Sequence, residues 1–320
     1  MTRDLDARTP LVDVHAHFLT ERYVAEARAA GHEHPDGMPD WPTWSAQEHL
    51  RLMDTWGIGR SVLSISSPGV HFGDDEPARA LARHVNDTGA AVVAEHPQRF
   101  GHFASLPMPD VEGSRREASR ALDELGSDGV AVESNAHGVY LGDERLESLW
   151  GDLDRRRAVV FVHPTSPPCA SRISLGRPRP MLEFVFDTTR TVSDLVFAGV
   201  LERFPSIRWI LTHGGGTLPL LADRIELFRT AFLGADGGTP VPEALRALWW
   251  DMAGTPFPRQ IPALVAAFGS DRVLYGSDWC WTPAAAATAQ VASVDAADPA
   301  PDGRTWRELT SDNAMRLLTP

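Results

Sequence analysis

The run Leu11-Val12-Asp13-Val14-His15-Ala16-His17 decides how the whole sequence is interpreted. Its apolar, valine-rich start is typical of a buried β-strand. Because successive side chains on a strand point to opposite faces, His15 and His17 share one face at its carboxyl end. Two imidazoles on one face are suited to binding a single metal ion. The run therefore predicts a strand that ends in part of a metal site.

Seven further short apolar runs, rich in β-branched residues and ending in Gly, Pro, Ser or His, follow along the chain. With the first run they predict eight strands: Leu11–His15, Ser61–Ile65, Gly101–Leu106, Gly129–Val132, Val159–His163, Ile207–Thr212, Leu248–Met252 and Val273–Gly276. Helix-like stretches lie between most of them: Ala46–Trp56, Pro77–His96, Val111–Leu125, Glu144–Arg157, Thr188–Phe204, Leu218–Phe232, Ile261–Phe268 and Asp312–Leu318. A strand followed by a helix, repeated eight times, predicts an α/β protein built on a (β/α)8 TIM barrel.

An open, doubly wound sheet is the alternative to the barrel. It would require a glycine-rich phosphate-binding turn after an early strand, and the sequence has none there. We therefore expect residues 1–320 to form one barrel domain, with a small insertion at about 18–45, after the first strand and over the barrel mouth. A second long, Pro-rich loop, residues 164–180, follows the fifth strand. Long loops at the carboxyl ends of barrel strands are where active sites are built.

Three more chemically active side chains stand at predicted strand ends. His163 closes the fifth strand, His213 closes the sixth, and Asp278 follows the eighth. The carboxyl ends of barrel strands meet at one rim, so these side chains should come together there. The expected metal ligands are His15, His17, His163 and Asp278. Three imidazoles and one carboxylate suit Zn²⁺, with Mn²⁺ or Fe²⁺ as alternatives.

The remaining histidines are expected at the surface or in loops, with His49 and His71 as the candidates for an exception. These histidines are His32, His34, His49, His71, His84, His96, His102 and His137.

Composition narrows the class of protein. The formal charge is −13, from 30 basic and 43 acidic residues, which disfavours nucleic acid and anionic membrane surfaces as partners. All basic residues are arginine, so neither a lysine Schiff base nor a carbamylated lysine bridging two metals can form. Two distant cysteines, a polar stretch up to residue 10 and no apolar span of membrane length lead us to expect a soluble, cytoplasmic protein.

The sequence resembles the amidohydrolase superfamily over nearly its whole length. The resemblance is carried by the runs Val12–His17, Leu52–Asp54, Arg99–Gly101, Phe161–Pro164, Thr212–Thr217, Gly276–Asp278 and Asn313–Ala314. It is strongest in the branch that includes aminocarboxymuconate semialdehyde decarboxylase. Within that branch, the runs Ser66–Asp74 and Tyr140–Asp143 resemble salicylate-type decarboxylases, such as those that act on 6-methylsalicylate.

The resemblance also implies roles for individual residues. In the decarboxylase branch, the histidine of the His-Gly-Gly-Gly run lies beside the metal and works with the aspartate in proton transfer. These residues correspond to His213 and Asp278. The branch has an arginine 11 positions after that histidine, here Arg224, which clamps the substrate carboxylate and can come from the neighbouring subunit. The alternative for Arg224 is a surface helix arginine paired with Asp223 or Glu226.

The sequence departs from the semialdehyde decarboxylase at one position that bears on the substrate. His49 stands where that enzyme has a second arginine, which suggests a substrate with a single carboxylate. The main hypothesis is therefore metal-dependent, non-oxidative decarboxylation of a small ortho-hydroxy aromatic carboxylic acid, without an organic cofactor. Hydrolysis of a lactone, amide or ester is the alternative, and a binding protein with a decayed site is the third possibility.

A homodimer with its interface near the barrel mouth is also expected. Tryptophans are frequent around the predicted rim, and buried aromatic residues line either an aryl pocket or a subunit contact. They are Trp41, Trp44, Trp249, Trp250, Trp279 and Trp281.

Overall fold

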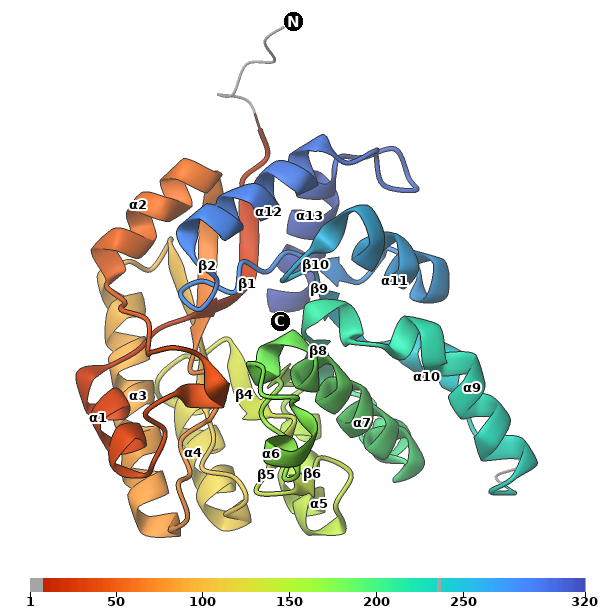
Figure 1. Cartoon of the computed structure of the whole chain (residues 1–320), viewed down its shortest axis with the longest axis horizontal. Coiled ribbons are helices and arrows are strands. Elements are labelled where there is room, and N and C mark those ends of the chain that lie inside the picture. Colours follow the sequence, from red (N-terminus) through yellow and green to blue (C-terminus); the bar gives the residue numbers. More distant parts are fainter. Residues whose placement is uncertain (1–7, 235–236, 320) are drawn as a thin grey trace, which may run out of the picture.

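The barrel is built from eight parallel strands whose hydrogen-bonded order follows their order in the sequence, β1-β2-β3-β4-β7-β8-β9-β10 (Figure 1). Their bounds are β1 Leu11–His17, β2 Ile58–Ser64, β3 Phe100–Ser105, β4 Gly129–Glu133, β7 Val159–His163, β8 Arg208–Leu211, β9 Trp249–Asp251 and β10 Val273–Leu274. Two isolated parallel bridges, Asp13 with Tyr275 and Ala16 with Trp279, join the chain around β10 to β1. The computed structural model describes residues 8–234 and 237–319, so parts of the expected domain 1–320 lie outside the described residues.

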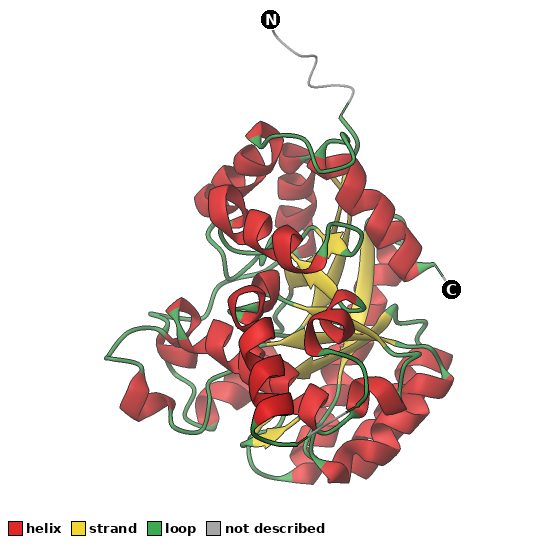
Figure 2. Cartoon of the chain, turned by 90° about the vertical axis from the view of Figure 1, so that its right-hand side faces the viewer, coloured by secondary structure: helices red, strands yellow, loops and turns green. Residues whose placement is uncertain are grey.

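Helices surround the strands (Figure 2). They are α1 Glu21–Ala29, α2 Ala46–Trp56, α3 Asp75–Glu95, α4 Val111–Asp123, α5 Glu147–Arg155, α6 Ala170–Ile173, α7 Glu183–Phe197, α8 Val200–Arg203, α9 Leu218–Ala231, α10 Val241–Arg246, α11 Ile261–Phe268, α12 Ala284–Ala296 and α13 Trp306–Leu318. A small antiparallel hairpin, β5 (Asn135–Ala136) and β6 (Val139–Tyr140), follows β4. Within residues 8–234 and 237–319, no helix is both long enough and apolar enough to cross a membrane.

The predicted barrel is confirmed. All eight predicted strands are present, and the helices Ala46–Trp56 and Ile261–Phe268 have the predicted bounds. The insertion after β1 contains helix α1, which begins where the Thr20 hydroxyl accepts a hydrogen bond from the backbone N–H of Tyr23. Helix α12 is not among the expected elements, because its alanine-rich sequence has little apolar periodicity.

Side chains from strands that are not neighbours in the sheet meet inside the barrel. The ring of Phe161 on β7 stacks on Phe103 of β3, with ring centres 5.4 Å apart, and also contacts the ring of His15 on β1 at 5.0 Å. All three side chains are fully buried. This packing fills the barrel below the mouth and supports His15 from beneath.

The prediction that Trp249 and Trp250 lie at the rim of the barrel is wrong. Both lie on β9 and are buried, and the ring of Trp250 stacks on Phe268 of α11 with centres 5.1 Å apart. Trp249 belongs to the cluster of side chains inside the barrel that includes Phe103 and Phe161, whereas Trp250 faces the helices outside β9. In contrast, Trp41 from the insertion packs against Trp281 from the loop after β10, with ring centres 5.5 Å apart.

Candidate metal centre

Four side chains that the sequence marks as metal ligands come together at the carboxyl ends of the strands. His15 and His17 lie at the end of β1, His163 at the end of β7, and Asp278 in the loop after β10. Their donor atoms all lie within 4.8 Å of one another. The Nε2 atoms of His15 and His17 are 3.0 Å apart, and they lie 3.5 and 3.3 Å from Oδ1 of Asp278. Three nitrogen donors and one oxygen donor therefore surround one point.

A hydrogen bond at the second ring nitrogen orients each imidazole. Nδ1 of His15 donates to Oδ2 of Asp251 at 2.8 Å, and Nδ1 of His163 donates to the carbonyl oxygen of Pro164 at 2.7 Å. Nδ1 of His17 lies 3.3 Å from a backbone carbonyl oxygen of β2. With the proton held on Nδ1, the Nε2 lone pairs are left for a metal ion.

The charges of the cluster favour a cation at its centre. Burial alone would lower the pKa of His15, but the carboxylates of Asp251 and Asp278 raise it to about 10. Burial and the neighbouring imidazoles hold the pKa of His163 well below its usual value, and burial also lowers that of His17. Burial would raise the pKa of Asp278, but the adjacent imidazoles hold it well below its usual range. Two carboxylates among buried imidazoles favour positive charge, which a proton on His15 or a divalent ion can supply.

His213 lies at the edge of the cluster. Its Nε2 is 3.6 Å from Oδ2 of Asp278, and its backbone N–H donates to Oδ1 of Asp251 at 2.9 Å. His213 and Asp278 both have left-handed backbone conformations, with φ of 54° and 57°. Strained conformations of this kind are concentrated at functional sites. The turn also needs glycine at position 215, where φ is 71° and a side chain would collide with the ring of Trp250.

Asp251, at the end of β9, is a site residue that the sequence analysis missed. Its fully buried carboxylate contacts the ring of His15 and accepts hydrogen bonds from the backbone N–H groups of His213 and Ala253. Burial would raise its pKa, but the contact with His15 keeps the pKa below its usual value. The available signal was an aspartate near the end of the predicted strand Leu248–Met252.

A cavity of about 370 Å³, here called the metal-side cavity, opens beside the cluster. His163, His213 and Asp278 form its inner wall. Most of the remaining wall is apolar: Met38, Pro180, Phe184, Val185, Trp281, Pro283 and Ala286. Among the described lining residues there is no arginine or lysine. This volume and lining suit one aromatic ring held by a few polar groups.

Arg224 does not line the metal-side cavity of its own chain. It is exposed on α9, and its guanidinium lies 4.9 Å from the centre of the Phe228 ring. Glu226, one of the two partners considered for it, is paired instead with Arg229 at 3.0 Å. The structure therefore places Arg224 on the outer surface, away from the four-residue cluster.

The prediction that the remaining histidines lie at the surface or in loops is wrong for His102. His102 on β3 is 2% exposed, and burial lowers its pKa to about 4, because it packs into the space beside Gly89 of α3. His49 is also buried. Nε1 of Trp44 donates to Nδ1 of His49 at 3.1 Å, and burial lowers the pKa of His49 to about 3. A neutral His49 cannot act as a second cationic clamp for a carboxylate.

The sequence and the fold are similar to known proteins. Residues 12–319 match the amidohydrolase family. The 6-methylsalicylic acid decarboxylase acuB of Aspergillus aculeatus is 33% identical over 319 residues, which cover 96% of this chain and 95% of the relative. A solved structure described as amidohydrolase II is 32% identical, with a TM-score of 0.91, and the match covers 97% of this chain and 100% of that one.

A more distant solved structure shares the fold. It is a dihydroxybenzoic acid decarboxylase from Polaromonas sp. JS666, with bound manganese and the inhibitor 2-nitroresorcinol. It is 24% identical, with a TM-score of 0.84, and the match covers 97% of each chain.

We expect Asp251→Asn to weaken metal binding by roughly 10- to 100-fold, as is usual when a metal-binding histidine loses its outer hydrogen-bond partner. The neutral amide no longer favours positive charge at His15. The measurement is a titration of metal-free protein with Zn²⁺ in competition with a fluorescent chelator. Asp271→Asn, which removes an exposed carboxylate just before β10, is the matched control and should bind metal as the wild type does. Equal affinities of wild type and Asp251→Asn would contradict this role for Asp251.

Proposed function

The chain belongs to the amidohydrolase family, and from this we propose that it is a metal-dependent decarboxylase that removes the carboxyl group of an ortho-hydroxy aromatic acid without oxidation. The observation that carries the proposal is the cluster of three histidines and one aspartate beside a largely apolar, ring-sized cavity. A relative that matches 96% of the chain is named for the decarboxylation of 6-methylsalicylic acid, an acid of this class.

The proposed ligands of one divalent ion are His15, His17, His163 and Asp278. This donor set suits Zn²⁺, and Mn²⁺ is the alternative, which is also the ion described in a protein of the same fold. When bound, the ion would supply Lewis acidity toward the carboxylate and ortho oxygens of the acid. The buried carboxylates of Asp251 and Asp278 support this assignment, because they favour a cation at the centre.

The residues around the cavity would orient the acid and move one proton. The side chains of Phe184 and Trp281 would pack against the ring and exclude water. Asp278 would take the proton of the ortho hydroxyl and deliver it to the ring carbon that bears the carboxylate. The bond from that carbon to the carboxylate then breaks, its electron pair restores the aromatic ring as a phenolate, and carbon dioxide leaves. His213, 3.6 Å from Asp278, would orient this carboxyl group and assist the proton transfer.

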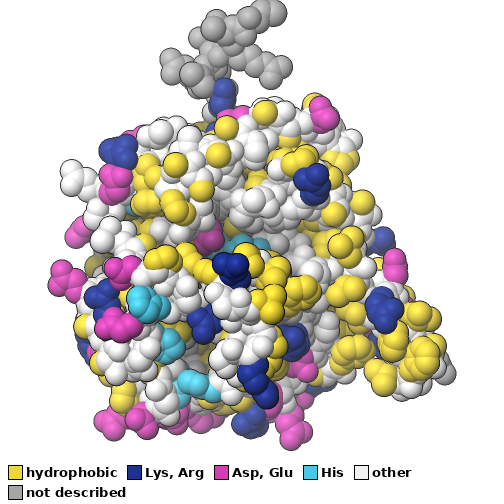
Figure 3. Space-filling model, viewed as in Figure 1, with side chains coloured by type: hydrophobic (Ala, Val, Ile, Leu, Met, Phe, Trp, Pro, Cys, Tyr) yellow, Lys and Arg dark blue, Asp and Glu magenta, His cyan; other side chains and the backbone are white. Residues whose placement is uncertain are grey.

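The described wall of the metal-side cavity holds no arginine or lysine that could pair with the substrate carboxylate. The proposal therefore includes a homodimer in which Arg224 of one protomer reaches the cavity of its partner. Around Arg224, helix α9 and its end expose apolar side chains, which gather on this part of the surface (Figure 3). They are Leu220, Leu227, Phe228, Phe232 and Leu233. An exposed apolar patch around a cation suits a symmetric subunit contact. The cytoplasmic location expected from the sequence stays a prediction.

The activity is tested on metal-loaded protein with a panel of 2-hydroxybenzoates, lactones and aryl esters. We expect at least one carboxyl-labelled 2-hydroxybenzoate to give labelled carbon dioxide and the corresponding phenol, measured by mass spectrometry. Hydrolysis of a lactone or ester without release of carbon dioxide would replace the proposal by the hydrolase alternative. No conversion of any member would favour a binding protein.

Metal content and rate separate the roles of the histidines. His163→Ala should reduce the metal from about one ion per chain to near zero, since it removes a ligand. His213→Ala should keep the metal and lose roughly 100-fold or more in kcat, the usual effect of removing a proton-transfer partner. His96→Ala, at the end of α3, is the control and should change neither quantity. Loss of metal in His213→Ala would instead make His213 a ligand.

The dimer and the clamp are tested together by mixing inactive variants. Arg224→Ala should retain the metal but weaken binding of a carboxylate ligand by about 2–4 kcal/mol, because its buried partner charge is left unpaired. Heterodimers of Arg224→Ala with His213→Ala should recover part of the activity, since one of their two sites then receives both intact residues. Heterodimers without recovered activity would exclude action of Arg224 across the interface, and a fully active monomer would remove the dimer from the mechanism.

A further inference from the structure

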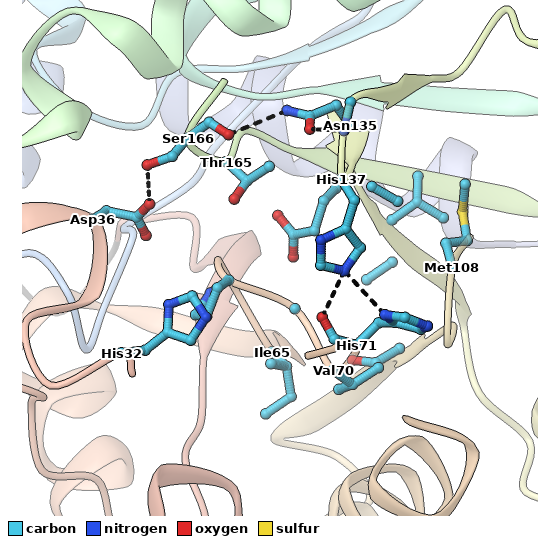
Figure 4. Close-up of a pocket in the computed structure, with 18 of the residues that line it drawn as sticks. His32, Asp36, Ile65, Val70, His71, Met108, Asn135, His137, Thr165 and Ser166 are labelled. Carbon is cyan, nitrogen blue, oxygen red and sulfur yellow. Dashed lines mark hydrogen bonds between the residues drawn. The ribbon is translucent and has the colours of Figure 1, made fainter. Parts of the chain in front are cut away.

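A second cavity, of about 530 Å³, lies beside the metal-side cavity. Figure 4 shows residues that line this second cavity. Part of its wall is apolar and comes from the ends of the early strands and the loops that follow them: Ile65, Val70, Leu106, Met108, Ala131 and Val132. The polar part comes from the insertion, from the end of β4 and from the loops after β2, β4 and β7: His32, Asp36, His71, Glu133, His137 and Thr165. The steps proposed above use none of these side chains.

The two cavities are neighbours. Asp36 lines both of them. Ser67 lines the metal-side cavity and Thr165 the second one, and their hydroxyl oxygens are 2.6 Å apart, so this pair stands between the cavities. Glu133 on β4 pairs in register with His163 on β7, and its Oε2 lies 3.6 Å from Nδ1 of His163. A group that extends from a ring at the metal centre past the hydroxyl pair would therefore meet Glu133.

Two residues of this cavity, Glu133 and Arg179, have a buried side-chain atom without a hydrogen-bond partner among the described residues. The Oε2 atom of Glu133 is buried and makes no hydrogen bond within the part of the chain that the structure describes. Other polar groups of the wall contact one another: Nδ1 of His71 lies 3.0 Å from Nε2 of His137, and Asp36 accepts a hydrogen bond from the hydroxyl of Ser166 (Figure 4). Buried carboxyl oxygens in folded proteins almost always have a hydrogen-bond partner. A ligand group is the partner that would complete this wall.

Carboxyl groups supply hydrogen-bond acceptors in the wall of the second cavity. Asp36 and Glu133 supply two carboxyl groups, whereas Arg179 is the one basic side chain besides histidine among its described lining residues. A hydroxyl or amino group can donate a hydrogen bond to either carboxyl group.

We propose that the second cavity is a subsite for a hydroxyl- or amino-bearing substituent of the aromatic acid, and that Glu133 is the residue that selects it. The inference rests on the proposed function, which places the carboxylate of the same acid at the metal centre. A methyl group in place of the hydroxyl would leave the buried carboxyl group of Glu133 unpaired. Ligands with the hydroxyl are therefore expected to bind roughly 10- to 100-fold more tightly than their methyl counterparts.

Binding is measured apart from turnover, by calorimetry on metal-loaded protein. The probes are matched pairs of benzoates that carry a hydroxyl or a methyl group at the same meta or para position and have no ortho hydroxyl. The readout is the ratio of the Kd of the methyl compound to the Kd of the hydroxyl compound. We expect this ratio to be about 10 or more for at least one ring position. Glu133→Leu should bring the ratio close to one, and Glu133→Gln should give an intermediate ratio, because its amide still forms hydrogen bonds. Glu124→Gln, which changes an exposed residue directly after α4, is the matched control and should keep the wild-type ratio.

Because Glu133 lies next to His163, a substitution of Glu133 could also disturb the metal site. A second variant separates the two effects. Ala136→Trp fills the second cavity from the β5–β6 hairpin and should also lower the ratio, with the metal content measured for every variant. A wild-type ratio near one, or an unchanged ratio in metal-loaded Glu133→Leu or Ala136→Trp, would overturn the subsite. If the ratios change as expected but no 2-hydroxybenzoate loses carbon dioxide, the subsite stands and decarboxylation fails. If a 2-hydroxybenzoate loses carbon dioxide but the hydroxyl compounds bind no more tightly than their methyl counterparts, decarboxylation stands and the subsite fails.

Discussion

The buried hydrogen bond between Nδ1 of His15 and Oδ2 of Asp251, 2.8 Å long, is the interaction on which the site depends. It joins β1 to β9, and the same carboxylate holds the backbone of His213 in its turn. Asp251 and Asp278 both bring negative charge into a group of buried imidazoles. Burying such charges without a compensating cation is costly, so a bound ion would stabilise the fold as well as supply the chemistry. The closed barrel makes this arrangement possible because it brings the ends of distant strands to one rim.

Much of the fold and of the cluster could be predicted because the signals are local. Apolar runs and helical periodicity locate the strands and most helices, and a histidine or aspartate after an apolar run marks a strand end at the rim. His15 and His17 share a face through strand geometry alone. Their meeting with His163 and Asp278 follows once the barrel is assumed, since parallel strands end on the same side. The assignment of these residues as ligands is a proposal that the geometry supports.

The parts that could not be predicted depend on contacts between residues far apart in the sequence. Asp251 acquires its role only when β9 lies near β1, and the burial of His102 depends on how closely α3 approaches β3. The β5–β6 hairpin is held by Asp187 of α7, whose fully buried carboxylate accepts hydrogen bonds from Asn135 and from the hydroxyl of Tyr140 at 2.8 and 2.6 Å. The run that begins at Tyr140 thus shapes the wall of the second cavity.

Anomalous diffraction from crystals of the metal-loaded protein with a bound 2-hydroxybenzoate tests the central claim most directly, because it places the ion and the acid together. The account predicts one anomalous peak per chain, within bonding distance of His15, His17, His163 and Asp278, with the carboxylate and ortho oxygens of the acid on the same ion. A second peak of equal height in the barrel mouth, a peak away from these four side chains, or an acid bound with its carboxylate turned away from the ion would contradict it.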